Sequence, residues 1–241
     1  MAPLCFTELQ WLLDKIDWRT VNPRVLGRIR DQRSTDTCWA EAIASLLSAL
    51  RILVNPTEEY KDIPAKSLLK ICTKGTEKEF YVELALETCL WTKIEVGRRK
   101  ENCAAIGFGT VKGDEEDYII SILKRTPVVV VLHYSTFGLQ VALSDVVAGT
   151  IYAPKRHVIK KQMEKMLKTP GEIGNHAALL IGAETDPCGV NYWIVQDSRG
   201  LQRHDNGIFF VKRPSSLAPT EGNAIYQAYY PLMKDKLQPK F

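Results

Sequence analysis

The sequence predicts an α+β fold made of two lobes with a cleft between them, and two observations support this prediction. Amphipathic helical patterns fill the N-terminal half, whereas the C-terminal half contains short β-branched or aromatic runs between turn residues. This segregation of helices from strands is typical of α+β proteins. The length of 241 residues allows one large domain or two small ones that share a cleft.

The predicted helices follow from apolar residues that recur at helical spacing. A capping box of Thr7 and Gln10 precedes a short N-terminal helix. The strongest pattern starts near Cys38 and continues until Asn55 and Pro56 stop it. Further helices are predicted over 65–72, after a capping box of Thr76 and Glu79, and after a cap at Asp114, with a polar loop over 97–103.

Five short runs in the C-terminal half predict strands. They are PVVVVLHY (127–134), AALLIGA (177–183), NYWIVQD (191–197), NGIFFVKR (206–213) and AIYQAYYPL (224–232). The predicted organisation is an N-terminal helical extension over 1–15, a helical lobe over 16–118, a β-rich lobe over 119–233 with a basic insert at 155–173, and a tail over 234–241. No internal repeat or low-complexity segment interrupts this order.

Composition excludes several functional classes. No apolar run approaches the roughly 20 residues that cross a bilayer, so no membrane partner is expected. The net charge of +4 is too small to indicate nucleic acid. The six cysteines form no CxxC pair and no Cys/His cluster with zinc-ligand spacing, so neither a metal nor another cofactor is predicted. The N-terminus lacks the pattern of a secretory signal peptide.

The basic charge is concentrated in one segment. Residues 155–168 contain six Lys or Arg and one acid, a net charge of +5, which leaves −1 for the rest of the chain. Such a run is commonly a solvated surface helix. An alternative is a basic rim beside the cleft that gates it or recruits acidic peptides.

Cys38 is the first candidate for chemistry because it lies in the first turn of the strongest predicted helix. The unpaired N–H groups and the dipole of a helix N-terminus favour a thiolate, and the same groups can stabilise an oxyanion. A small buried core cysteine is the structural alternative. Two further candidates are His176, which opens a predicted strand, and Asp197, which ends another. Each of these two residues alone is as readily structural: His176 as a histidine at a strand edge, and Asp197 as a solvated acid in a turn.

Together and in this order, these elements resemble the papain family of cysteine peptidases. His176 follows Cys38 by 138 residues and Asp197 follows it by 159, close to the family's spacing of Cys, His and Asn. The resemblance continues through IDWR (16–19), RDQ (30–32), PVVV (127–130), AGTIY (148–152), the NGI and VKR of 206–213, and YYP (229–231). It covers about residues 16–233 and implies the two-lobe papain-like fold, with an antiparallel β-barrel-like second lobe.

The resemblance implies a role for each matching residue. Cys38 corresponds to the nucleophile, and His176 to the base that takes its proton and returns it to the leaving amine. Gln32 and the Cys38 backbone N–H correspond to the oxyanion hole, and Asp197 stands where the family has the Asn that orients the imidazole. The resemblance also implies substrate contacts from Trp39, Asn175 and Gln227, and a disulfide between Cys72 and Cys103. Two buried thiols in a reducing compartment are the alternative to that disulfide.

The sequence departs from the family beside the catalytic positions. The charge of Asp197 is expected to raise the pKa of His176. Arg199 replaces the Trp that shields the orienting contact, and it could pair with Asp197 and draw it from His176. These departures leave two hypotheses, a cysteine peptidase acting on peptides or proteins and an inactive papain-like module that binds them. With no signal peptide or prosegment before Ile16, a cytoplasmic or nuclear location is expected, and a lysosomal, vacuolar or secreted one if the sequence is truncated.

Overall fold

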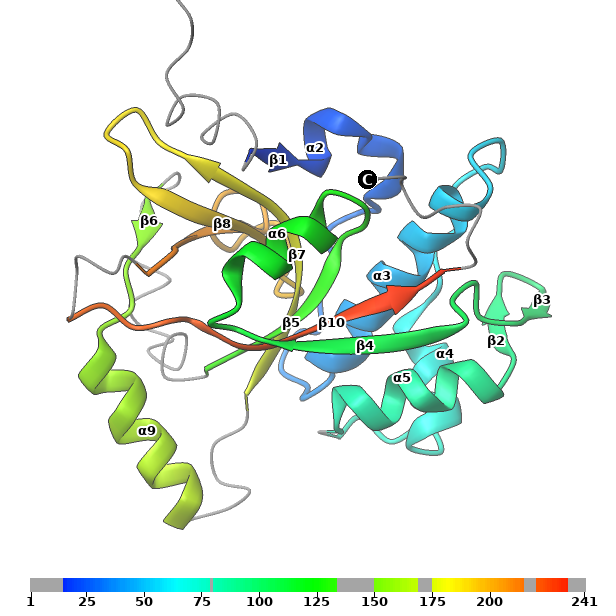
Figure 1. Cartoon of the computed structure of the whole chain (residues 1–241). Coiled ribbons are helices and arrows are strands. Elements are labelled where there is room, and N and C mark those ends of the chain that lie inside the picture. The colour runs from blue at the N-terminus through cyan, green and yellow to red at the C-terminus, as the bar shows by residue number, and fades with distance from the viewer. Residues whose placement is uncertain (1–14, 79, 134–149, 169–174, 215–219, 234–241) are drawn as a thin grey trace, which may run out of the picture.

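The structure is a computed structural model, and it describes residues 15–78, 80–133, 150–168, 175–214 and 220–233. The predicted N-terminal helix beginning at Thr7 and the tail over 234–241 lie outside these residues. The helices within residues 38–91 gather on one side of a large sheet, whereas the later helices lie beside its strands, and this mixture of helices and one large sheet is the α+β class predicted (Figure 1).

The helical part is built around one long central helix. This helix, α3 (Cys38–Val54), begins at the cysteine and ends before Asn55 and Pro56, as the sequence predicts. It packs against α4 and α5, while two short elements precede it. The bounds are α2 (Trp18–Val21), the 3₁₀ turn η1 (Pro23–Val25), α4 (Ala65–Cys72), α5 (Val82–Trp91) and α6 (Glu116–Leu123).

The strands form one large sheet and a small hairpin. The sheet has the order β4-β10-β5-β7-β8-β9-β6, with β1 paired to β7, and its neighbours are antiparallel except for β6 and β9. It does not close into a barrel, so β-barrel-like describes it only loosely. The bounds are β1 (Ile16–Asp17), β4 (Gly107–Lys112), β5 (Val128–Leu132), β6 (Ile151–Tyr152), β7 (His176–Thr185), β8 (Asn191–Gln196), β9 (Ile208–Lys212) and β10 (Ile225–Leu232).

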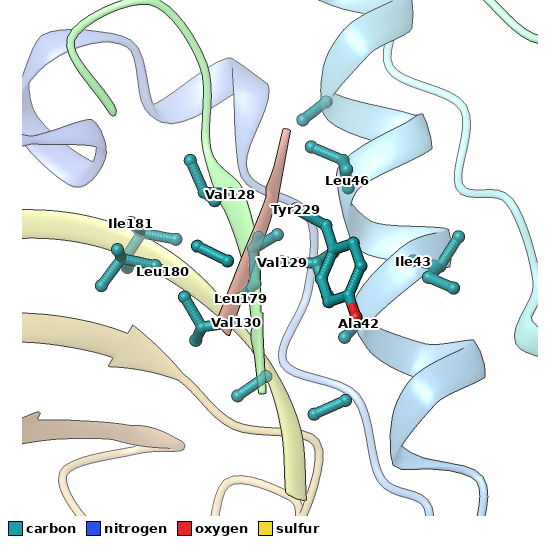
Figure 2. Packing of buried hydrophobic residues seen from close by; sticks show 14 of the residues in the cluster. Ala42, Ile43, Leu46, Val128, Val129, Val130, Leu179, Leu180, Ile181 and Tyr229 are labelled. Atoms are coloured by element: carbon teal, nitrogen blue, oxygen red, sulfur yellow. The ribbon is translucent and has the colours of Figure 1, made fainter. Parts of the chain in front are cut away.

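The core lies where α3 packs on the sheet. Figure 2 shows Val129 of β5 and Tyr229 of β10 turned toward Ala42 and Leu46 of α3, whereas Val128 points to the other side of the sheet. The fully apolar runs of β5 and β7 are therefore explained by burial on both faces. This packing brings the start of β7, with His176, to the start of α3, with Cys38.

Three local predictions were wrong. The helix after Gly75 begins at Val82, so the capping box of Thr76 and Glu79 does not start it. Thr76 instead closes a turn with Thr73 after α4. The predicted polar loop over 97–103 contains strand β3 (Arg99–Glu101), which forms a hairpin with β2 (Ile94–Val96). The helix predicted after a cap at Asp114, α6, has Glu115 at its N-cap position, and no side chain among the described residues caps it. Strand β4 was not predicted, because its sequence, GFGTVK, has no clear apolar alternation.

The basic segment forms a helix, α9 (Arg156–Lys168), at the edge of the sheet (Figure 1). Its Lys160 and Lys161 are exposed, which fits a solvated surface helix. Its first turn is anchored, because Ile159 is only 8% exposed and contacts Gly222. Among the helices with described residues, none is long and apolar enough to cross a membrane.

Candidate active site

The thiol of Cys38 lies at the first residue of α3, held by three neighbours. It forms a hydrogen bond with the His176 imidazole and accepts hydrogen bonds from the backbone N–H groups of Ala177 and Trp39. Burial raises the pKa of this thiol, but the hydrogen bond and charge of His176 outweigh burial, and the net pKa of Cys38 is lowered. A thiol with a lowered pKa beside an imidazole is an activated nucleophile.

His176 connects the thiol to a carboxylate. It is the first residue of β7, where it pairs with Leu132 of β5, and it is 3% exposed. Its Nε2 lies 2.7 Å from Asp197 Oδ1. Burial lowers the pKa of this imidazole, yet the Asp197 charge and hydrogen bond, together with Cys38, raise it to about 10. An imidazolium and a thiolate can therefore coexist at neutral pH.

Asp197 follows β8 and is held by its backbone as well as its side chain. Its N–H donates to the Gly207 carbonyl over 2.8 Å, and its Oδ1 accepts the Ser198 N–H over 2.8 Å. Burial would raise the pKa of this carboxyl, but the charge and hydrogen bond of His176 and the hydrogen bond of His204 hold it well below its usual range. Asp197 is thus an anion whose side chain accepts hydrogen bonds from His176, Ser198 and His204.

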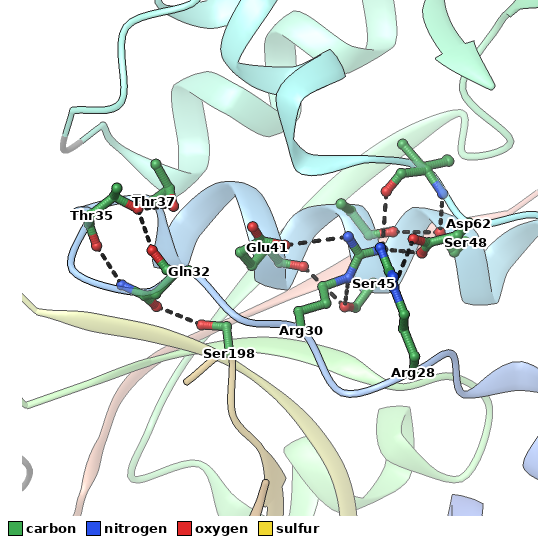
Figure 3. A network of polar contacts seen from close by, with 12 residues as sticks. Arg28, Arg30, Gln32, Thr35, Thr37, Glu41, Ser45, Ser48, Asp62 and Ser198 are labelled. Atoms are coloured by element: carbon green, nitrogen blue, oxygen red, sulfur yellow. Dashed lines mark hydrogen bonds and ion pairs between the residues drawn. The ribbon is translucent and has the colours of Figure 1, made fainter. Parts of the chain in front are cut away.

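The side-chain amide of Gln32 is fixed in orientation beside the start of α3. Ser198 Oγ donates to Gln32 Oε1 over 2.6 Å, and Gln32 Nε2 donates to the Thr35 carbonyl over 2.7 Å (Figure 3). Because an amide nitrogen has two hydrogens, the second hydrogen remains for an oxyanion. The backbone N–H of Cys38, at a helix N-terminus, is the complementary donor.

Arg30 fastens the segment that carries Gln32 to α3. Its guanidinium donates to Ser45 Oγ over 2.8 Å and to Glu41 Oε2 over 3.3 Å, and it pairs with Asp62 (Figure 3). Arg30 is 7% exposed, and its charge is satisfied by this network. The sequence analysis quoted Arg30 within RDQ but gave it no role, since its partners lie 11 to 33 residues away.

Three predicted substrate contacts differ in their surroundings. Trp39 is only 1% exposed and packs against Phe80, so it belongs to the core rather than to a substrate surface. Asn175 precedes His176, and its Oδ1 is buried without a hydrogen-bond partner among the described residues. Gln227 is half-buried on β10, where its Oε1 accepts a hydrogen bond from Tyr229. The structure joins Cys38, His176 and Asp197 directly, and it links Gln32 to them through Ser198, the residue after Asp197.

Cys72 and Cys103 are free thiols, so the disulfide that the resemblance implies is not formed in the structure. Each sulfur has its own partner. The Cys72 thiol forms a hydrogen bond with Thr88, and burial raises its pKa to about 11. The Cys103 thiol accepts a backbone hydrogen bond from Ala105.

Arg199 does not draw Asp197 away from His176. Its backbone forms a bridge with Asp31, and both oxygens of Asp197 are already engaged. Oδ1 accepts from His176, while Oδ2 lies 3.1 Å from the Nε2 of a second histidine, His204. The pairing of Arg199 with Asp197, which would most have favoured an inactive module, is therefore not formed. Sequence reasoning missed His204, because no periodicity or motif distinguishes it within the turn that follows Arg199.

A thiol joined to a buried imidazole and carboxylate, with an oriented amide in the segment that precedes the thiol, is the arrangement of nucleophilic thiol catalysis. The sequence matches the family described as "Papain family cysteine protease" over residues 12–228. The chain therefore belongs to the papain family of cysteine proteases.

Individual relatives are distant. A "Probable cysteine protease RDL4" from Arabidopsis thaliana is 23% identical over 90% of this chain, and a "Viral cathepsin" from Adoxophyes honmai nucleopolyhedrovirus is 25% identical over 84%. The chain spans 58% of the length of each. Among solved structures, the bromelain protease from Ananas comosus in complex with the E64 inhibitor superposes with a TM-score of 0.66 at 18% identity, covering 92% of this chain and 99% of that one. This likeness confirms the fold.

The pH dependence of the thiol offers a test of the Asp197 contact. Asp197→Asn removes the charge that raises the pKa of His176 and leaves the opposing effect of burial. We expect the upper pKa in the rate of Cys38 inactivation by a peptidyl epoxide to fall by roughly 1–3 units from about 10. The imidazolium protonates the opening epoxide, so this limb reports the His176 proton. An unchanged upper limb would contradict the contact.

Proposed function

We propose that this protein is a cysteine peptidase that hydrolyses peptide bonds through a thiolate–imidazolium pair. The observation that carries the proposal is the position of His176, between the thiol of Cys38 and the carboxylate of Asp197, with the contact to Asp197 buried. The pKa of the thiol is lowered and that of the imidazole is raised, which is the charge separation such chemistry needs.

In the first half of the reaction, the Cys38 thiolate attacks the carbonyl carbon of the scissile peptide. The carbonyl oxygen becomes an oxyanion, which accepts hydrogen bonds from Gln32 Nε2 and the Cys38 backbone N–H. The oxyanion then reforms the carbonyl, the C–N bond breaks, and His176 gives its proton to the leaving amine. The product of this half is a thioester between Cys38 and the acyl part of the substrate.

In the second half, water replaces the amine. His176, now neutral, takes a proton from the water as the water oxygen attacks the thioester carbonyl. The same donors hold the second oxyanion, and its collapse releases the carboxylic acid and restores the Cys38 thiolate and the imidazolium. Asp197 stays ionised throughout and stabilises the positive charge on His176.

Covalent labelling tests the proposal directly. A thiol-reactive peptidyl epoxide should modify Cys38 with a stoichiometry of one and faster than it modifies Cys188, an exposed thiol in the same chain. Peptide mapping identifies the labelled residue, and hydrolysis of fluorogenic peptides reports turnover. Labelling of Cys38 no faster than Cys188, without turnover, would favour a module that binds peptides and does not cleave them.

We also propose that the exposed bases of α9 attract acidic peptides. The support is their charge and exposure, since Arg156, Lys160 and Lys161 of α9 lie at the surface, as does Lys155 just before the helix. Exposed charges act over about 10 Å at 0.1 M salt, so this attraction should weaken as ionic strength rises. Removing the whole helix would also expose Ile159, and charge reversal is therefore the cleaner test.

The double substitution Lys160→Glu and Lys161→Glu should raise KM for an acidic peptide by a few-fold at low salt. The effect should be much smaller at 0.5 M salt, where the screening length is about 4 Å. The free energy of unfolding should change by less than about 0.5 kcal/mol, as for other surface substitutions. The matched control is Lys66→Glu with Lys100→Glu, which makes the same charge change at exposed sites on α4 and β3. Equal effects of both pairs would contradict a role for α9.

A further inference from the structure

His204 occupies the side of Asp197 that faces away from the catalytic imidazole. Its Nε2 lies 3.1 Å from Asp197 Oδ2, and its side chain is 5% exposed. The ring packs against Phe209 with centroids 5.0 Å apart. Backbone geometry brings the ring back to Asp197, because His204 has a φ of 56° in the turn that ends at Gly207, whose carbonyl accepts the Asp197 N–H.

The tautomer of His204 follows from its surroundings. The ring Nδ1 is buried and has no hydrogen-bond partner among the residues that the structure describes. A hydrogen on Nδ1 would therefore be buried without an acceptor, which is costly. The tautomer with its hydrogen on Nε2 leaves only an unpaired acceptor and donates to the Asp197 carboxylate.

We propose that His204 is a positioning residue, which donates from Nε2 to Asp197 Oδ2 and so holds the carboxylate where its Oδ1 accepts from His176. The proposal rests on the peptidase function proposed above. Without His204, the Oδ2 atom would be a buried charged acceptor with no described partner, and the carboxylate would turn to find one. Arg199, at the position where the resemblance implies a Trp, forms a backbone bridge with Asp31, so His204 is the side chain that contacts Oδ2.

This role also explains why residue 197 is Asp rather than the Asn of the family. Three donors point at its side chain: the Nε2 hydrogens of His176 and His204, and the Ser198 N–H. A carboxylate has two acceptor oxygens and can serve all three, whereas an amide has one oxygen and two hydrogens. With Asn at 197, either His176 or His204 would face an N–H group. Asp197 and His204 are thus a matched pair.

The pairing predicts that one substitution has opposite effects in two backgrounds. In the parent chain, His204→Phe keeps a ring but removes the donor, and it should slow inactivation of Cys38 by a peptidyl epoxide by roughly 10- to 100-fold, the loss expected for a hydrogen bond to a charged group. In an Asp197→Asn chain, the same substitution removes a clashing donor and should increase the rate by roughly tenfold. His204→Gln, which keeps an N–H donor, should retain more of the parent rate than His204→Phe.

A purely structural His204 would give a different pattern. His204→Phe would then lower the melting temperature equally in both backgrounds and change the inactivation rate by the same factor in each, which would overturn the proposal. A second measurement does not depend on reactivity. The low-field Nε2–H proton resonance of His176 should weaken or move upfield in His204→Phe and persist in His204→Gln. If the epoxide does not modify Cys38 in the parent chain, the proposed peptidase function fails. The role of His204 is tested separately, because an unchanged His176 resonance in His204→Phe would overturn it.

Discussion

Cys38→Ala is expected to abolish peptide hydrolysis, a loss of roughly a millionfold in kcat, the scale set by removing the nucleophile of a hydrolase triad. The substitution removes the sulfur that the hydrogen bonds of His176, Ala177 and Trp39 hold in place. Alanine is the best helix former, so α3 should still begin at residue 38. Turnover of a fluorogenic peptide measures the loss, and circular dichroism confirms the fold.

The matched control removes another thiol from the same chain. Cys188 is exposed in the turn between β7 and β8, and Cys188→Ala should leave turnover at the parent level. Cys5→Ala and Cys89→Ala should also leave the chemistry intact, although Cys89 is buried and its loss can lower stability. Full activity in Cys38→Ala would refute the nucleophile assignment.

The second large effect is expected at the oxyanion donor. Gln32→Ala should lower kcat by ~10²–10³, the usual cost of losing one such donor. The donor acts only when negative charge develops on the carbonyl oxygen, so KM should change little. The structure predicts that this donor is ready before substrate arrives, since Ser198 and Thr35 already fix both ends of the amide.

Two variants separate the missing donor from local disorder. Gln32→Glu has the same shape and can still accept from Ser198 Oγ, but it offers no N–H and adds a negative charge, so its kcat should fall at least as far as that of Gln32→Ala. Ser198→Ala keeps the donor and removes only one of its restraints, and it should cost less. A Gln32→Ala enzyme within threefold of the parent kcat would contradict the assignment.

The elements that the sequence predicted well are those with strong local patterns. The 17 residues of α3 carry their own periodicity, and Pro56, two residues after the last helical residue, Val54, prevents the helix from continuing. Strands β5 and β7–β10 stand out because apolar and β-branched residues cluster in them. Strand β4 and the hairpin of β2 and β3 lack that signal. Strand β4 also pairs with β10, more than 100 residues further along the chain, whereas β2 and β3 pair locally.

In the candidate site, too, some features were predictable from local sequence and others were not. The sequence alone determined the order and types of the reactive groups, since a cysteine at a helix start and the spacing to His176 and Asp197 can be read along the chain. Only the tertiary structure decided which atoms meet. The bond between Gln32 and Ser198 joins residues 166 positions apart, and the choice of His204 rather than Arg199 as the second partner of Asp197 follows from how one turn folds back. Such contacts depend on the geometry of non-local packing, where a small rotation of the backbone selects one side chain over its neighbour, and no local pattern records that choice.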